Sequence, residues 1–240
     1  MNTITFTTRK LTDDLLLVVA FEVETRAVCT CWDFEVVDLD DISAFRNFLV
    51  NRVVVVHAIA ELIDNSIQAG LEVNETTNVE IICVDKVDTS GSRKRRRIEQ
   101  IAVYDNSIGM DAAMLRIALQ FGNGSNLTPD KQNGIGKFGM GLPNASISQC
   151  CHVDVWSWRD GQCYYTYLDI EEIREGNLRE VPEPETAMLP EYWKSLIRDR
   201  IGEHGTLVVW SQLDRVRWKT SAAFCRNIEF LVGRMYRYFL

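Results

Sequence analysis

One stretch of the sequence, residues 57–69 (HAIAELIDNSIQA), constrains the fold more than any other. A helix advances about 100° per residue, so that side chains four positions apart lie nearly above one another. In this stretch the spacing produces one polar stripe, formed by His57, Glu61, Asn65 and Gln68. The remaining positions are mostly apolar, which predicts a largely buried helix. Because buried carboxylates and amides without partners are costly, the stripe must meet either protein groups or a ligand with a metal ion.

Composition narrows the class of protein. The 240 residues are 46% hydrophobic and 25% charged, which fits one globular domain spanning residues 1–240, or at most two small ones. No apolar run approaches the roughly 20 residues needed to span a bilayer, and the seven cysteines lack the spacing of a zinc site. The start of the chain lacks the pattern of a signal peptide, so we expect a soluble, cytoplasmic protein. A net charge of -8 disfavours a surface that coats nucleic acid in general.

Hydrophobic periodicity predicts the other elements. Runs of β-branched and aromatic residues predict a strand or hairpin region over residues 3–8, 14–24 and 27–37. Alternating runs predict antiparallel strands over residues 79–84 and 98–104 and a second hairpin over residues 150–158 and 163–168, and residues 204–210 are a turn into a strand. Helical spacing predicts helices over residues 40–49, 111–119, 191–200 and 221–239. The four valines at 53–56 fit either a strand or the start of the central helix.

Five basic residues stand between the predicted strands at 79–84 and 98–104: Arg93, Lys94, Arg95, Arg96 and Arg97. At a hairpin tip such a run is suited to contact nucleic acid or an acidic partner. The alternative is a solvated loop without a partner, which short basic runs in acidic chains commonly form.

A glycine-rich loop follows a long polar segment. Residues 122–133 have neither periodicity nor apolar content, and a loop of this length in a compact domain suits a lid. Residues 134–146 begin with four glycines in eight positions, with Lys137 among them. The oriented backbone N–H groups of such a loop are suited to hold phosphates. A dinucleotide-binding fold is disfavoured because no buried strand precedes the loop, and Phe138 stands where a P-loop carries serine or threonine.

Four separated motifs occur in one order: residues 61–65 (ELIDN), 105–110 (DNSIGM), 136–141 (GKFGMG) and 205–206 (GT). With these motifs in this order, the chain resembles the GHKL ATPases, which include DNA gyrase, the ninety-kilodalton heat-shock chaperones, MutL and the microrchidia proteins. Residues 138–149 (FGMGLPNASISQ) are most similar to those of prokaryotic microrchidia-like ATP-binding proteins.

The resemblance implies an α/β (α+β) two-layer sandwich, in which helices cover one face of a mixed, mainly antiparallel sheet. ATP and Mg²⁺ would bind between the helices and a lid formed by residues 111–135. Residues 1–45 would be an N-terminal extension of unassigned role. Residues 221–240 would form a helix that leads towards a second domain absent from this chain.

The resemblance also assigns roles to residues of the motifs. Glu61 would be the general base that activates water, and Asn65 would bind Mg²⁺ through its amide oxygen. Asp105 would accept a hydrogen bond from the adenine amino group. Gly109 would let the backbone approach the base, and Met110 would form an apolar wall.

The glycine loop would bind the phosphates of ATP, through Gly136, Lys137, Phe138, Gly139, Met140 and Gly141. Thr206 would support the adenine pocket beside Asp105 through a water molecule.

Three positions depart from the family pattern. Gln68 stands where several members carry an acid, and Ser107 replaces a glycine. Pro143-Asn144 occupies positions where relatives often have a lysine or another polar pair. None of these changes removes the base, the metal ligand or the adenine acceptor, so the resemblance implies hydrolysis as well as binding.

The leading interpretation is a Mg²⁺-dependent ATPase in which ATP-driven lid closure and dimerisation form a conformational switch that acts on a partner or on DNA. Two alternatives stay open. A histidine-kinase catalytic domain is disfavoured because the sequence shows no phosphoacceptor-helix region and because Glu61 suits the activation of water. A non-hydrolysing ATP-sensing module is disfavoured by the same residue, although the geometry of the lid could still silence catalysis.

Overall fold

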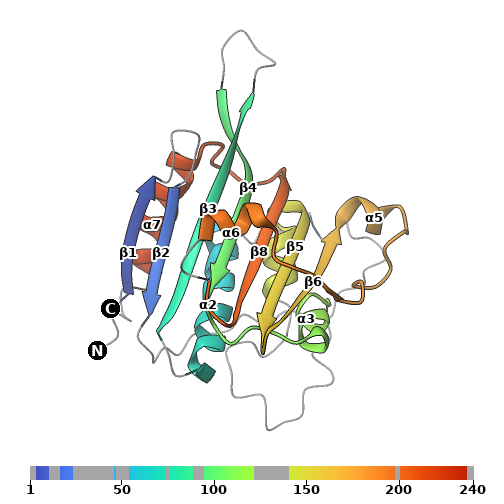
Figure 1. Ribbon diagram of the computed structural model, residues 1–240. Coiled ribbons are helices and arrows are strands. Elements are labelled where there is room, and N and C mark those ends of the chain that lie inside the picture. Colours follow the sequence, from blue (N-terminus) through green and yellow to red (C-terminus); the bar gives the residue numbers. More distant parts are fainter. Residues whose placement is uncertain are drawn as a thin grey trace.

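A single sheet with the strand order β1-β2-β3-β4-β8-β5-β6-β7 organises the chain (Figure 1). The computed structural model describes residues 4–10, 17–23, 46, 54–73, 76–88, 95–121, 141–197 and 201–236. The strands are β1 Ile4–Lys10, β2 Leu17–Val23, β3 Thr77–Asp88, β4 Arg95–Asp105, β5 Cys150–Arg159, β6 Gln162–Asp169, β7 Glu185–Thr186 and β8 Gly205–Leu213. Every pairing between these described strands is antiparallel.

Helices lie mainly behind the sheet in the view of Figure 1. They are α2 Val55–Val73, α3 Ala112–Ala118, α4 Gly141–Ile147, α5 Ile170–Arg174, α6 Glu191–Ile197 and α7 Ser221–Met235. Helix α2 is the central one, because it packs against both α4 and α7 as well as against β3. The predicted α/β two-layer sandwich with a mainly antiparallel sheet is therefore confirmed.

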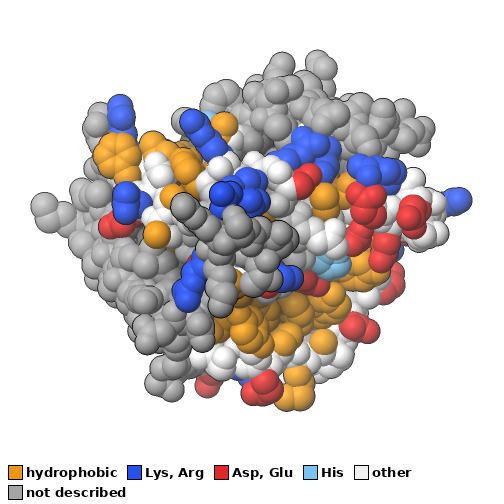
Figure 2. All heavy atoms as spheres, turned by 90° about the horizontal axis from the view of Figure 1, so that it is seen from above, with side chains coloured by type: hydrophobic (Ala, Val, Ile, Leu, Met, Phe, Trp, Pro, Cys, Tyr) orange, Lys and Arg blue, Asp and Glu red, His pale blue; other side chains and the backbone are white. Residues whose placement is uncertain are grey.

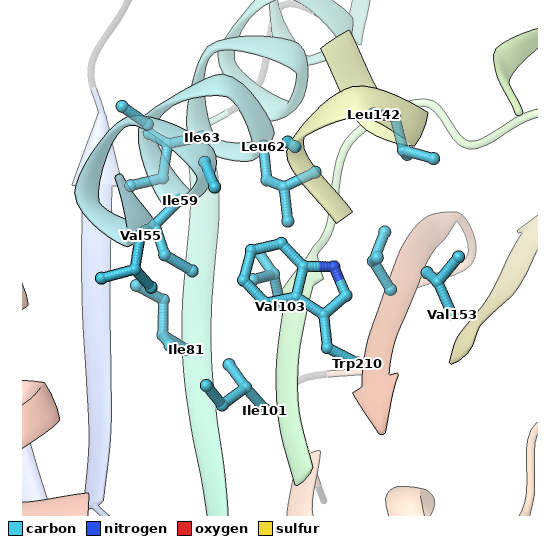
Figure 3. Packing of buried hydrophobic residues seen from close by; sticks show 14 of the residues in the cluster. Val55, Ile59, Leu62, Ile63, Ile81, Ile101, Val103, Leu142, Val153 and Trp210 are labelled. Atoms are coloured by element: carbon cyan, nitrogen blue, oxygen red, sulfur yellow. The ribbon is translucent and has the colours of Figure 1, made fainter. Parts of the chain in front are cut away.

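Alternation along the strands creates the main core on the face covered by α2, α4 and α7. Trp210 of β8 is fully buried there, together with Ile101 of β4. Figure 3 shows Ile59 and Leu62 of α2 pointing toward these sheet residues. Burying an aliphatic or aromatic side chain of this size contributes about 1.5–3 kcal/mol. Such contacts fix the rotation of α2 about its axis, and with it the direction of the polar stripe.

The opposite face of the sheet carries a second apolar cluster. Tyr104 and Trp158 stack there with ring centroids 6.0 Å apart. Trp193 and Ile197 of α6 are buried against the same cluster. One short helix thus covers part of the face that the two-layer prediction leaves open.

The predicted elements correspond closely to those observed. The runs at 3–8 and 14–24 correspond to β1 and β2, and the valines at 53–56 enter helix α2 from Val55 onward. The predicted strand at 27–37 lies outside the described residues, as does the predicted helix at 40–49 except for Arg46. The short elements α5 and β7 were not predicted.

In the part of the chain that the structure describes, none of the helices is both long and apolar enough to cross a bilayer.

Candidate functional site

Two members of the polar stripe of α2, Glu61 and Asn65, lie next to the start of helix α4. His57 at the start of the stripe is exposed, whereas Glu61, Asn65 and Gln68 are half-buried. A Cβ added to Gly141, the first residue of α4, would lie 3.0 Å from Oε2 of Glu61 and 3.6 Å from Nδ2 of Asn65. A side chain at position 141 would crowd the Glu61 carboxylate unless that carboxylate shifted. The helix therefore presents a carboxylate and an amide, one turn apart, at the end of the glycine-rich loop.

The Glu61 carboxyl is electrostatically perturbed. Burial raises its pKa, and the negative charge of Asp64, three residues further along α2, raises it further. A carboxylate whose pKa lies above the ordinary range is a stronger base than a fully solvated one. Position and basicity are thus both suited to proton abstraction in front of Gly141.

Asp105 ends strand β4 and is 7% exposed. Its Oδ2 accepts a hydrogen bond of 2.8 Å from the hydroxyl of Ser66, the residue after Asn65 on α2. Its Oδ1 accepts a bond of 3.0 Å from the backbone N–H of Ser107 and a second bond from the Ser107 hydroxyl. Burial raises the pKa of Asp105, and the bonds from Ser107 and Ser66 oppose that effect.

Three polar residues form a row across neighbouring strands. Thr206 of β8 stands opposite Asp105 in the β4–β8 ladder, and Ser157 of β5 stands opposite Thr206. The hydroxyls of Ser157 and Thr206 lie 2.9 Å apart. Ser157 also accepts a bond of 2.8 Å from the N–H of Met110 and lies 3.1 Å from the carbonyl oxygen of Gly205. The row fixes the turn after β4 against the start of β8.

Gly109 in this turn has a φ of +68°, which favours glycine. A Cβ at this position would lie 2.2 Å from the carbonyl oxygen of Trp158. Both observations show that the packing of the turn itself requires glycine at position 109, independently of any ligand.

The sequence profile of the family described as histidine kinase-, DNA gyrase B-, and HSP90-like ATPase matches residues 53–203, which is more than half of the chain. The chain belongs to this ATPase family. The first three GHKL motifs, at residues 61–65, 105–110 and 136–141, lie inside the matched range. The fourth, Gly205 and Thr206, follows it directly.

Among solved structures, the chain is similar to the B-subunit of the DNA gyrase from Myxococcus xanthus. The two are 17% identical with a TM-score of 0.41, and the alignment covers 72% of this chain. The chain spans 42% of the length of that subunit. Comparison with curated proteins gives no match.

The GHKL motifs are brought together by the fold as far as they are described. Glu61, Asn65 and Gly141 meet at one place, and Asp105 and Thr206 meet beside Ser66 of the same helix. The residues predicted to bind phosphate, Gly136, Lys137, Phe138, Gly139 and Met140, lie outside the described residues, as does the predicted lid from residue 122 onward.

The departures from the family pattern have structural counterparts. Ser107 uses its extra hydroxyl to donate to Asp105, which a glycine could not do. Pro143 and Asn144 are buried in α4. The Oδ1 atom of Asn144 has no hydrogen-bond partner among the residues that the structure describes. For Gln68 the structure gives a half-buried position on α2 and no role.

Three residues of the site were missed by sequence reasoning. Ser66 follows a predicted metal ligand, and Ser157 lies within an apolar strand. Nδ1 of His204 lies 2.7 Å from the carbonyl oxygen of Ser107 and 3.0 Å from that of Asn106, and so supports the turn after β4. Each acts on a residue distant in the sequence, so no local pattern marks it.

Proposed function

We propose that the chain binds Mg²⁺-ATP at the junction of α2, the turn after β4 and the start of α4, and hydrolyses it to ADP and phosphate. The observation that carries this proposal is that three groups share helix α2. Glu61 and Asn65 meet at Gly141, and Ser66 of the same helix holds Asp105. A base, a metal ligand and an adenine acceptor are thereby fixed relative to one another.

Glu61 accepts a proton from the attacking water in this mechanism. Its raised pKa brings the carboxylate nearer to the pH at which a base is effective. The attacking water would lie in front of Gly141, where the absence of a side chain leaves room next to Oε2 of Glu61.

Asn65 fits Mg²⁺, since an amide oxygen is a ligand that this ion accepts in phosphate sites. The open space beside its amide, which a Cβ at position 141 would narrow, is consistent with such a ligand. Bound Mg²⁺ would neutralise charge on the phosphate oxygens.

Asp105 accepts a hydrogen bond from the adenine amino group. Each carboxylate oxygen has two lone pairs, so Oδ2 retains acceptor capacity beyond the bond from Ser66. Met110, whose side chain packs against the main apolar cluster, provides an apolar wall for the base. Thr206 stands beside Asp105 and supports the same pocket through a water molecule.

The remaining elements of the proposal rest on the family. Residues 136–141 bind the phosphates, the lid over residues 111–135 closes on ATP, and closure promotes dimerisation of a cytoplasmic switch protein. Within the family, we propose that the chain is related to the prokaryotic microrchidia-like ATP-binding proteins. Measurement of oligomeric state with and without a non-hydrolysable ATP analogue tests the switch, because a monomer in both conditions contradicts it.

DNA is the partner that we propose for the hairpin of β3 and β4. Arg95, Arg96 and Arg97 are exposed on β4, where the hairpin projects beyond the neighbouring strands (Figure 1). Lys86 lies opposite Arg97 on β3. Figure 2, seen from the projecting end, shows Lys and Arg side chains around it. Arg93 and Lys94, at the tip, lie outside the described residues.

Phosphate release by the wild type and by Glu61→Gln tests hydrolysis. Removing a general base should slow turnover about 10²- to 10⁴-fold while ATP binding persists. Glu191→Gln is the matched control, because that glutamate is 85% exposed on α6 and should turn over like the wild type. Equal measurable rates for wild type and Glu61→Gln would contradict the role of Glu61 as the base, and absence of phosphate release by both would leave a non-hydrolysing ATP-sensing module as the better interpretation. Phosphate transfer to a protein histidine would instead support a kinase.

A further inference from the structure

The C-terminal end of α7 is tied to α2 by one buried side chain. Tyr236 caps α7 and is 5% exposed. Its hydroxyl donates a hydrogen bond of 2.6 Å to Oδ1 of Asp64 and lies 3.2 Å from the carbonyl oxygen of Ala60. Both oxygens belong to the same turn of α2.

That turn carries the reactive part of the polar stripe. Asp64 follows Glu61 by three positions and directly precedes Asn65. At about 100° per residue, Asp64 points roughly 60° away from Glu61 around the helix. It therefore borders the stripe without belonging to it, and its charge contributes to the electrostatic environment of Glu61.

The hydroxyl has one hydrogen, and the shorter contact identifies the Asp64 carboxylate as its acceptor. A hydrogen bond to a charged acceptor is stronger than a neutral one. It keeps the Asp64 carboxylate directed to α7, and away from the space in which phosphates of like charge would lie. The contact with Ala60 places the same hydroxyl against the preceding carbonyl of the turn.

We propose that Tyr236 is a positioning residue of the ATPase site: through Asp64 it fixes the turn of α2 that carries Glu61 and Asn65, and so couples the end of α7 to the site. The statement that this turn is catalytic rests on the proposed function. The coupling itself does not, because it concerns contacts within the nucleotide-free protein.

Tyr236→Phe separates the hydroxyl from the ring, which packs in the main apolar cluster. Val232→Ala is the matched control, because Val232 lies one turn earlier on α7, is fully buried in the same cluster and has an aliphatic side chain. It weakens the packing of α7 without removing a polar contact to α2.

Amide hydrogen exchange of the nucleotide-free protein is the first measurement. In Tyr236→Phe the amides of residues 60–66 should exchange about 5-fold faster, while those of residues 101–104 in β4 keep the wild-type rate. In Val232→Ala, any acceleration should affect both segments alike. Wild-type exchange of residues 60–66 in Tyr236→Phe overturns the coupling, whether or not the protein hydrolyses ATP.

Steady-state ATP hydrolysis is the second measurement. Tyr236→Phe should lower kcat about 5-fold and change KM for ATP less than about 2-fold, because the base and the metal ligand are misplaced while Asp105 still holds the adenine base. In an Asp64→Ala background the same substitution should change kcat less than about 2-fold. An undiminished effect in that background would show that Tyr236 does not act through Asp64. Absence of hydrolysis in the wild type would refute the proposed function and leave the exchange result to decide the coupling.

Discussion

The hydroxyl of Ser66 lies 2.8 Å from Oδ2 of Asp105 and donates a hydrogen bond that joins α2 to the end of β4. Both residues are buried. Ser66→Ala should lower the free energy of unfolding by about 1–3 kcal/mol, because a buried acceptor loses a donor. It should also weaken binding of a non-hydrolysable ATP analogue about 5-fold, since Asp105 is less well fixed. Calorimetric titration and urea unfolding measure the two effects.

Ser195→Ala provides the control for that substitution. Ser195 is exposed on α6, on the other face of the sheet, and its hydroxyl donates to the carbonyl oxygen of Tyr192. This variant should bind the analogue like the wild type. Wild-type affinity in Ser66→Ala as well would argue against a role of the Ser66–Asp105 bond in nucleotide binding.

Asp105→Asn tests the adenine assignment. The amide can still accept from Ser107 and donate to the Ser66 hydroxyl, so the fold should be retained. The substitution replaces one accepting carboxylate oxygen of residue 105 by a donating NH₂ group, however, and the adenine amino group is itself a donor. Affinity for ATP should therefore fall about 10-fold or more, with a smaller loss of affinity for GTP. Equal losses for the two nucleotides would contradict recognition of adenine by this residue.

The part of the site that the sequence predicts is the part encoded locally. Glu61 and Asn65 share a helix face because they are four residues apart, and Asp105 ends a strand recognisable by its alternation. Ser157 illustrates the limit of such reasoning. It is a serine within an apolar run, and only the pairing of β5 with β8 places it opposite Thr206.

Contacts between distant parts of the chain escaped prediction for the same reason. Tyr236 and Asp64 are separated by 172 positions, and Arg46 and Asp214 by 168. The second apolar layer under α6 was missed because a seven-residue helix carries too few positions to show which face it buries. Strand β7, with two residues, carries even less periodic information.

The exposed arginines of β4 give a prediction about DNA. The binding constant K for DNA falls as the salt concentration rises. In a plot of log K against log[salt], each phosphate contact by a basic side chain adds about 0.9 to the steepness of the slope on duplex DNA. Replacing Arg95, Arg96 and Arg97 by serine should weaken binding to random duplex DNA and reduce that slope by up to about 3. Fluorescence anisotropy at several salt concentrations measures it. Absence of DNA binding by the wild type at low salt would refute this partner.

Arg46 should be essential to stability, because it joins three segments. Its side chain is 3% exposed, and its guanidinium donates to both Asp214 oxygens, at 2.9 and 2.6 Å. It also donates to the carbonyl oxygens of Ile147 and Cys150, at 2.6 and 2.7 Å. Arg46→Met keeps the apolar stem and leaves these acceptors without the guanidinium. We expect a loss of about 3 kcal/mol, since water can still reach the partly exposed Asp214.

Arg159→Met is the comparison for Arg46→Met. Arg159 pairs with Asp160, whose side chain is 84% exposed, and an exposed pair contributes about 0–1 kcal/mol. Thermal unfolding should separate the two variants by several degrees, at about 2–4 °C per kcal/mol for a domain of this size. Similar midpoints for both would show that the buried guanidinium adds nothing beyond its packing.

His152 gives the protein a pH-dependent element away from the proposed site. Its Nε2 lies 3.1 Å from Asp154 and its Nδ1 lies 2.8 Å from Asp169. The hydrogen bond to Asp154 is the largest cause of a raised pKa of His152, and the bond to Asp169 raises this pKa further. Burial opposes both bonds, and the resulting pKa is about 9. An unfolded histidine has a pKa of about 6.5. The imidazolium therefore stabilises the fold fully below about pH 6.5, and this contribution is lost as the pH rises through about 9.

Urea unfolding of the wild type and of His152→Gln between pH 6 and pH 9.5 measures this contribution, because other titrating groups cancel in the difference. The wild type should exceed the variant by up to about 3 kcal/mol at pH 6, reduced by solvent screening of a side chain that is 21% exposed. The advantage should decline from about pH 6.5 and vanish near pH 9, since the folded state there no longer binds the extra proton. Asp154→Asn should shift this decline to lower pH, because it removes the stronger cause of the raised pKa. A difference that stays constant over the whole range would mean that His152 is held by packing against Tyr167 and not by its charge.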